Sequence, residues 1–172
     1  MVSTAQDLFT PTEAAAFTGV PVTTVRREIE KQIIRPRRAT RQRPCLRVTL
    51  PDLLYLRVLH GIDLDLPARA RARIRNAIAR HYGVARPSGE LVVSGLLTLK
   101  IGEARSLVLG LLRRFASWRK RLVRDPEILG GEVVFPKSRL SVRHVGAMLE
   151  RGESSGVIKQ EYPYLTDDDL EL

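Results

Sequence analysis

Two helix-forming segments near the start of the chain are separated by only three residues, and this spacing restricts the possible folds more than any other feature. Thr10–Glu13 has the pattern of a capping box, with a proline at the first helical position. The turn Gly19–Pro21 ends that helix with a glycine and restarts the chain with a proline. In Val22–Ile33, apolar residues then recur at helical spacing. Two short helices joined by so tight a turn are typical of a helix-turn-helix.

The residues after the second helix are rich in proline and arginine. Residues 33–38 and 43–48 are short extended stretches, and their prolines confine them to an exposed hairpin. Thr49–Asp52 then begins a third capped helix, which stops at Gly61. Helix, turn, helix, hairpin and helix follow the plan of a winged helix. We therefore expect residues 1–61 to form a winged helix-turn-helix domain that binds DNA.

The outer face of the second helix and the hairpin carry the side chains that DNA recognition requires. Threonine and arginine near the start of a helix suit the major groove, and arginines on a wing suit phosphates or the minor groove. The predicted DNA-binding residues are Thr23, Thr24, Arg26, Arg27, Arg35, Arg37, Arg38, Arg41 and Arg43. The alternative is an ordinary solvated surface, since 24 of the 29 basic residues of the chain are arginine.

Residues 62–124 are predicted to be a basic middle segment with a β-hairpin between two helices. The Arg-rich helix in Pro67–Tyr82 either contacts phosphate or is a solvated helix whose arginine stems cover a thin apolar strip. Glu90–Ile101 is predicted as the hairpin and Glu103–Arg124 as the longest helix. Apolar residues at heptad-like spacing on that helix are predicted to form a dimer interface, with packing against the chain's own elements as the alternative. These residues are Val108, Leu111, Phe115, Trp118 and Leu122.

Residues 125–172 are predicted to form an acidic unit of their own. Two short helical patterns cover Ser141–Arg151 and Ser154–Glu161, and a capping box at Thr166 begins a third. The simplest interpretation is a trihelical, helix-turn-helix-like domain. Together with the two preceding parts, this gives a mainly α fold.

The charge of the chain differs between these three parts. In total, 29 basic and 19 acidic side chains give a formal net charge of +10. Residues 1–61 contribute +5, residues 62–124 contribute +10, and residues 125–172 contribute −5. Neutralising phosphates is the sequence-independent source of affinity for DNA. We therefore expect the winged helix to contact DNA and the acidic last part to contact protein.

Several classes of protein are disfavoured by composition. A chain that is 44% hydrophobic has enough apolar material for packed cores, and its single cysteine, Cys45, fits a reducing compartment. There is no signal-peptide pattern at the start and no apolar run near the ~20 residues that span a bilayer. His60, His81 and His144 lack metal-ligand spacing. We expect a cytoplasmic protein that is no enzyme, makes no membrane contact, and has no metal or cofactor.

Two resemblances to known families rest on these segments. Phe9–Lys31, with its Arg-rich wing and the helix of Thr49–Leu54, resembles the winged helix-turn-helix of the MerR/excisionase type. In the last part, the motifs resemble the family called domain of unknown function 433, whose members are antitoxins of VapBC-type modules. Those motifs are Asp125–Phe135, Arg139–Val145, Met148–Gly152 and Tyr162–Thr166. One departure is Lys137–Arg139, where the family usually has Gly-Thr-Arg.

The second resemblance implies a homodimer that binds a PIN-type ribonuclease toxin and represses its own promoter by binding double-stranded operator DNA. Such toxins hold Mg²⁺ with a cluster of carboxylates. Arg139 and Arg143 suit an arginine inserted into that cluster. Asp167, Asp168 and Asp169 suit the other mechanism, which is to cover a basic RNA path.

Two other functions fit parts of the same sequence. One is a transcription regulator or excisionase-like DNA-binding protein without a toxin partner. The other is an RNA-binding factor, which would need exposed aromatic residues for stacking, and aromatic residues are only 5% of the chain.

Overall fold

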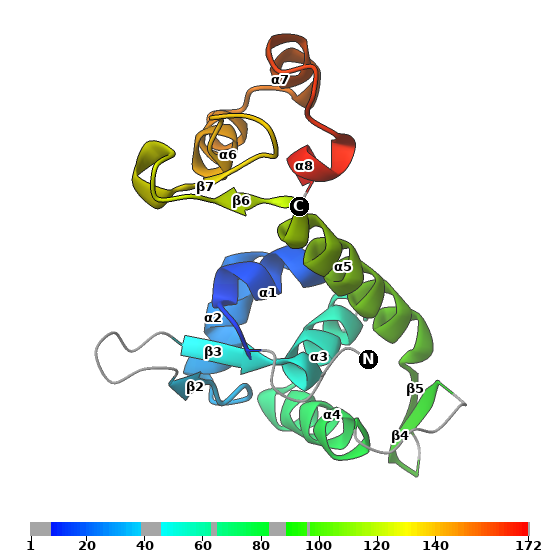
Figure 1. Ribbon diagram of the computed structural model, residues 1–172. Helices are drawn as coiled ribbons and strands as arrows, with labels where there is room; N and C mark the ends of the chain where they lie inside the picture. The colour runs from blue at the N-terminus through cyan, green and yellow to red at the C-terminus, as the bar shows by residue number, and fades with distance from the viewer. Residues whose placement is uncertain (1–7, 39–45, 63–64, 83–88, 96, 172) are drawn as a thin grey trace. The chain divides into compact units, whose positions relative to one another are not determined.

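The computed structural model describes residues 8–38, 46–62, 65–82, 89–95 and 97–171, and it is mainly helical (Figure 1). The mainly α fold class is therefore confirmed. The chain divides into two compact units, Met1–Leu111 and Leu112–Leu172. We call these the N-terminal unit and the C-terminal unit.

The N-terminal unit begins with two helices whose ends were predicted from their caps. In α1 (Pro11–Thr18), the Thr10 side chain accepts from the Glu13 amide, and Glu13 accepts in return from the Thr10 amide at 2.7 Å. Gly19 ends the helix in the left-handed conformation at φ 72°. The second helix, α2 (Val22–Glu30), follows at once and ends three residues before the predicted limit.

A guanidinium from the third helix fixes the turn between α1 and α2. Arg57 lies in α3 (Leu50–His60) and donates from Nη1 to the Thr18 carbonyl at 3.2 Å. A Cβ atom at Gly19 would lie 3.3 Å from the same Nη1 atom. Glycine therefore meets two demands here, because it adopts the positive φ and leaves room for the arginine.

A small antiparallel sheet lies beside these helices. Its strand order is β1 (Leu8–Phe9), β3 (Leu46–Thr49), β2 (Arg37–Arg38), with Phe9 opposite Val48 and Arg37 opposite Arg47. Strands β2 and β3 are the predicted hairpin, whereas β1 was not predicted. Strand β3 leads directly into α3, which begins with the predicted capping box of Thr49 and Asp52.

The rest of the N-terminal unit is α4 (Ala68–His81), the hairpin of β4 (Glu90–Ser94) and β5 (Leu97–Lys100), and the first part of α5 (Gly102–Arg121). Helix α4 packs against α3 and β4, and its Ile74, Ala77 and Ile78 side chains are buried. The core also takes side chains from α1, α2 and α3. Its members include Ala14, Phe17, Val25, Leu53, Leu54, Tyr55 and Leu56.

The C-terminal unit contains the end of α5, a short hairpin and three helices. Helix α5 ends at Arg121, three residues before the predicted limit, because β6 (Val123–Arg124) pairs with β7 (Val133–Val134). The helices are α6 (Val142–Glu150), α7 (Ser155–Glu161) and α8 (Asp167–Glu171), as the caps predicted. The buried core of this unit consists of Trp118, Phe135, Val145, Met148, Ile158 and Leu165.

The two units divide at a different place from the predicted boundaries, which were 61/62 and 124/125. Helix α4 packs on α3, so residues beyond 61 join the first three helices. The last ten residues of α5 supply Trp118 to the C-terminal core, so that unit begins before residue 125. In the described part of the chain, no helix is long and apolar enough to cross a membrane.

Candidate nucleic-acid interface

The second helix presents one polar face to solvent and one face to the core. Thr23, Arg26, Arg27 and Glu30 are exposed, and their spacing of i, i+3, i+4 and i+7 places them on a single side of α2. We call these four residues the outward face of α2. Val25 is fully buried on the opposite side. A helix with this division can lay its outer face in a groove while the inner face stays packed.

The other predicted DNA-binding residues lie in different surroundings. Thr24 is half-buried beside the outward face of α2, and Arg35 and Arg37 are exposed. Arg38 belongs to β2, while Arg41 and Arg43 lie outside the described residues. The structure therefore brings Thr23, Arg26 and Arg27 to one helix face, and it places Arg35 just before the hairpin and Arg37 in its first strand, β2.

A buried carboxylate on the inner side of α2 was missed by the sequence analysis. Glu28 is 0% exposed, and its Oε2 accepts a hydrogen bond from the Tyr55 hydroxyl at 2.7 Å. Its Oε1 lies 2.9 Å from Nη1 of Arg71, which comes from α4. Glu28 thus connects α2 to both α3 and α4. The burial of Tyr55, followed by its bond to Glu28, raises the pKa of the phenol above its ordinary value, so it stays protonated and donates.

A second buried carboxylate is held in the same way one turn further along α4. Asp52 is 0% exposed, caps α3 through Oδ2, and accepts at Oδ1 from Nε of Arg75 at 2.8 Å. Arg71 and Arg75 are one helical turn apart, and each pairs with a different carboxylate. A charged residue at core spacing is the sequence signal that could have identified Glu28. It lies three residues after the core residue Val25, on the face of the helix that should be apolar.

The predicted dimer residues of α5 are divided between the two units. Val108 is buried and Leu111 is half-buried in the N-terminal unit. Trp118 is part of the C-terminal core, and Phe115 and Leu122 pack against that core. For these last three residues, packing within the chain is what the structure shows. This packing agrees with the alternative interpretation of the heptad-like spacing, which was packing against the chain's own elements. The apolar surface is supplied by α6, α7 and α8 in the same unit.

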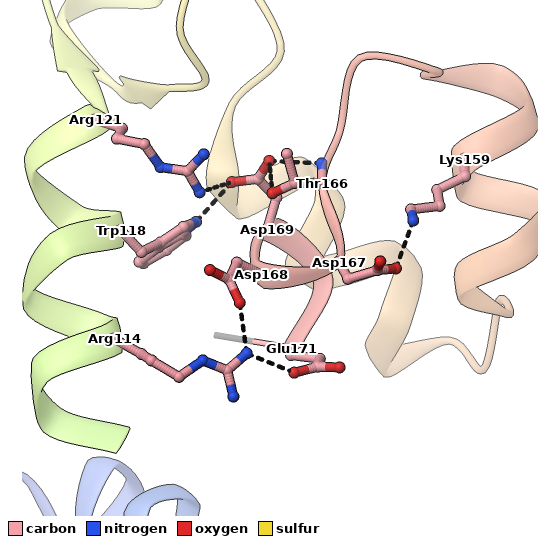
Figure 2. Close-up of polar contacts among 9 residues, drawn as sticks. All are labelled: Arg114, Trp118, Arg121, Lys159, Thr166, Asp167, Asp168, Asp169 and Glu171. Carbon is pink, nitrogen blue, oxygen red and sulfur yellow. Dashed lines mark hydrogen bonds and ion pairs between the residues drawn. The ribbon is translucent and has the colours of Figure 1, made fainter. Parts of the chain in front are cut away.

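The acidic residues at the end of the chain form ion pairs inside the C-terminal unit (Figure 2). We call Asp167, Asp168, Asp169 and Glu171 the α8 carboxylates. Arg114 pairs with Asp168 and, at 2.9 Å, with Glu171. Lys159 pairs with Asp167. These residues were predicted to cover a basic surface of another protein. Such a contact would compete with the ion pairs that they already form within the unit.

Asp169 is the most enclosed of the α8 carboxylates. Its Oδ1 accepts from Nε1 of Trp118 at 2.8 Å and from Nη2 of Arg121 at 3.2 Å, while Oδ2 accepts from the amide and hydroxyl of Thr166. Burial alone would raise its pKa. The bonds from Thr166 and Trp118 and the charge of Arg121 outweigh that effect, and the pKa of Asp169 is lowered.

Arg139 and Arg143, the other predicted toxin-binding residues, are both exposed. Arg143 lies 3.6 Å from Glu132 but keeps 88% of its side chain in solvent. Arg139 lines a hollow with Lys137 and Phe135. Lys137 adopts φ 55°, a conformation that favours glycine. Lys137 is the first residue of Lys137–Arg139, the segment in which the sequence departs from Gly-Thr-Arg.

The structural division changes the charge balance predicted from the sequence. Residues 1–111 carry 18 basic and 9 acidic side chains, a net charge of +9. Residues 112–172 carry 11 and 10, a net charge of +1. Residues 125–172 carry the net charge of −5 expected of them, and the basic residues of 112–124, which belong to the same unit, offset that charge. Positive charge is concentrated in the N-terminal unit.

The three histidines are not gathered into a site. Among the described residues, no three His, Cys, Asp or Glu side chains are grouped so as to hold a metal ion. His60, His81 and His144 are all exposed, and the His81 ring contacts the Ala77 carbonyl of its own helix.

The chain was compared with curated proteins, with solved structures and with protein families. No curated protein matches the chain. A similar solved structure is the crystal structure of Rv2018 from Mycobacterium tuberculosis, with 18% identity, 96% of this chain and 97% of that chain covered, and a TM-score of 0.32. Residues 122–172, which form most of the C-terminal unit, match the family described as protein of unknown function (DUF433).

Proposed function

We propose that this protein is a DNA-binding antitoxin that neutralises a PIN-type ribonuclease toxin by direct binding and represses its own operon. The observation that carries the DNA-binding part is the outward face of α2. Thr23, Arg26 and Arg27 share that face, and Glu28 fixes the opposite face to α3 and α4. A rigid helix with exposed arginines is the form of side-chain presentation that reads base edges in the major groove.

The electrostatics of the N-terminal unit support the same proposal. Its net charge of +9 attracts a polyanion from a distance. Arg35, just before the hairpin, and Arg37, in its first strand, are exposed and suited to phosphate contacts. In this proposal, α2 reads the sequence and the hairpin arginines fix the protein on the backbone.

The antitoxin part is supported by the match of residues 122–172 and by the motifs that resemble VapBC antitoxins. Of the two neutralising mechanisms, the arginine mechanism has the better support. The α8 carboxylates are already paired with Arg114, Arg121 and Lys159, whereas Arg139 and Arg143 are exposed to solvent. Arg139 and Arg143 are therefore the groups available to enter a cluster of carboxylates on the toxin.

Co-expression with the product of the neighbouring gene tests the antitoxin part. The proposal requires that product to arrest growth alone, to be tolerated with this protein, and to co-purify with it. The Arg139→Gln/Arg143→Gln double variant should lose protection, while a charge-matched Arg113→Gln/Arg119→Gln variant should keep it. If the product of the neighbouring gene does not arrest growth and does not co-purify, the antitoxin part is overturned. The alternative, a transcription regulator without a toxin partner, would then remain.

A further inference from the structure

The five arginines of α4 fall into two sets with different surroundings. Arg71 and Arg75 point to the buried carboxylates Glu28 and Asp52, and they hold α4 against α2 and α3. Arg69, Arg73 and Arg80 are exposed, and α4 contains no acidic residue that could pair with them along the helix. The second set therefore takes no part in the buried ion pairs of the fold.

The exposed set lies along one side of the helix. Arg69, Arg73, Asn76 and Arg80 are spaced at i, i+4, i+7 and i+11, which gives a polar stripe about 16 Å long. The apolar side of α4, formed by Ile74, Ala77 and Ile78, is already buried. The stems of the exposed arginines are thus not needed to cover that apolar strip.

A groove in the N-terminal unit collects part of this stripe. It is lined by residues of α4 and β4, namely Arg73, Arg75, Asn76, Ala79, Arg80, Val93 and Ser94. Its lining contains no acidic side chain among the described residues. Guanidinium, amide and hydroxyl groups around one hollow are hydrogen-bond donors suited to phosphate oxygens. We call this hollow the α4–β4 groove.

We propose that the α4–β4 groove binds the phosphate backbone of the same DNA duplex that α2 reads, as a second contact outside the predicted winged helix. This inference rests on the proposed function. The Glu28–Arg71 pair joins α4 to α2, so the groove keeps a fixed position relative to the outward face of α2. Two cationic surfaces on one rigid unit favour one extended polyanion over two separate small ligands.

The test is the salt dependence of binding to a labelled duplex that covers the region upstream of the protein's own gene. Each lost phosphate contact lowers the slope of log affinity against log salt by about 0.9. The Arg73→Gln/Arg80→Gln variant should therefore lose about 1.8 from the slope. Between about 50 and 200 mM salt, its affinity should then fall about 12-fold less than that of the wild type.

Two further variants of the full chain make the result specific. Arg113→Gln/Arg119→Gln removes the same charge from the C-terminal unit, at two exposed positions, and should keep the wild-type slope. Arg26→Gln/Arg27→Gln tests the outward face of α2 separately. Thermal unfolding of each variant, followed by circular dichroism, checks that the exposed substitutions leave the fold intact.

The outcomes separate this inference from the proposed function. A wild-type protein that shows no preference for the duplex over single-stranded RNA overturns both. A wild type that binds the duplex, together with an Arg73→Gln/Arg80→Gln variant of unchanged slope, overturns only the second contact. A reduced slope in that variant and an unchanged slope in the charge-matched control supports the second contact.

Discussion

Helix α4 and the last turns of α5 look alike in sequence, since both are rich in arginine, yet their arginines have different roles. On α4, Arg71 and Arg75 reach carboxylates that are 0% exposed. On α5, Arg114 reaches Asp168 and Glu171, whose side chains are 44% and 61% exposed. The number of arginines in a helix therefore says little about its role. The burial of the partner carboxylate decides whether the pair holds the fold together.

The same contrast distributes charge between the two units. In the N-terminal unit, two carboxylates occupy two of the five α4 arginines and leave three exposed. In the C-terminal unit, the α8 carboxylates pair with two of the cations at the end of α5 and with Lys159 on α7. Excess positive charge is left in the unit that carries the outward face of α2.

Removing the buried carboxylate of the N-terminal unit should have the largest effect. The Glu28→Gln substitution leaves the half-buried Arg71 without its counter-charge, and we expect a loss of about 3–5 kcal/mol in the free energy of unfolding. Urea denaturation followed by circular dichroism measures it. Glu30→Gln, on the outward face of the same helix, is the matched control and should stay within about 0.5 kcal/mol of wild type. Equal stability of the two variants would show that the buried pair does not hold α2.

A smaller effect is expected for the enclosed carboxylate of the C-terminal unit. Asp169→Asn removes the charge that accepts from Trp118, Arg121 and Thr166, and we expect a loss of about 2 kcal/mol. Trp118 is the single tryptophan of the chain, so its fluorescence follows the unfolding of this unit. The exposed neighbour Asp168→Asn should shift the transition far less. A transition that both substitutions shift equally would contradict the special position of Asp169.

Acid should weaken the C-terminal unit through the same residue. The pKa of Asp169 is lower in the folded state, so its contribution is complete above the unfolded pKa of about 3.9 and is lost as the pH falls through the folded value. Urea midpoints from Trp118 fluorescence should therefore decrease below about pH 4. The decrease should be smaller in Asp169→Asn, and an identical pH profile in both proteins would count against this assignment.

The smallest effect is expected for the exposed pairs between α5 and α8. Arg114→Gln removes two ion pairs at once, but all three side chains are substantially exposed, by 44% to 61%. Pairs of this kind contribute little and are screened by salt. We expect a Trp118 unfolding midpoint close to that of the wild type, and any difference should vanish at high salt. A large shift that persists at high salt would mean that these pairs do hold α8 in place.

Much of the fold was predictable because its helices begin and end with local signals. Thr10, Gly19 and Thr49 act through bonds to residues three or four positions away, which a sequence displays directly. Strands β1 and β6 were missed because two residues cannot show an alternating pattern. Strand β1 pairs with β3, about 40 residues further along the chain, and β6 pairs with β7 in the segment that follows it, where the sequence predicted the end of the long helix.

Of the candidate site, only the exposed residues on the outward face of α2 could be predicted from the sequence. The exposure of Arg26 and Arg27 follows from helical spacing next to Val25. The pairing of Glu28 with Tyr55 and Arg71 depends on tertiary contacts across 27 residues and more. The pairing of the α8 carboxylates could not be predicted for the same reason, because their basic partners on α5 lie more than 45 residues earlier in the chain.

Duplex binding by the full chain tests the central claim most directly. Titration of the labelled upstream duplex with wild type and with Arg26→Gln/Arg27→Gln compares proteins that share the buried Glu28 network. We predict that the variant keeps its fold and loses at least about tenfold in affinity for this duplex. The charge-matched Arg113→Gln/Arg119→Gln variant should bind like the wild type. Equal affinity of all three proteins would contradict the claim that the outward face of α2 reads DNA.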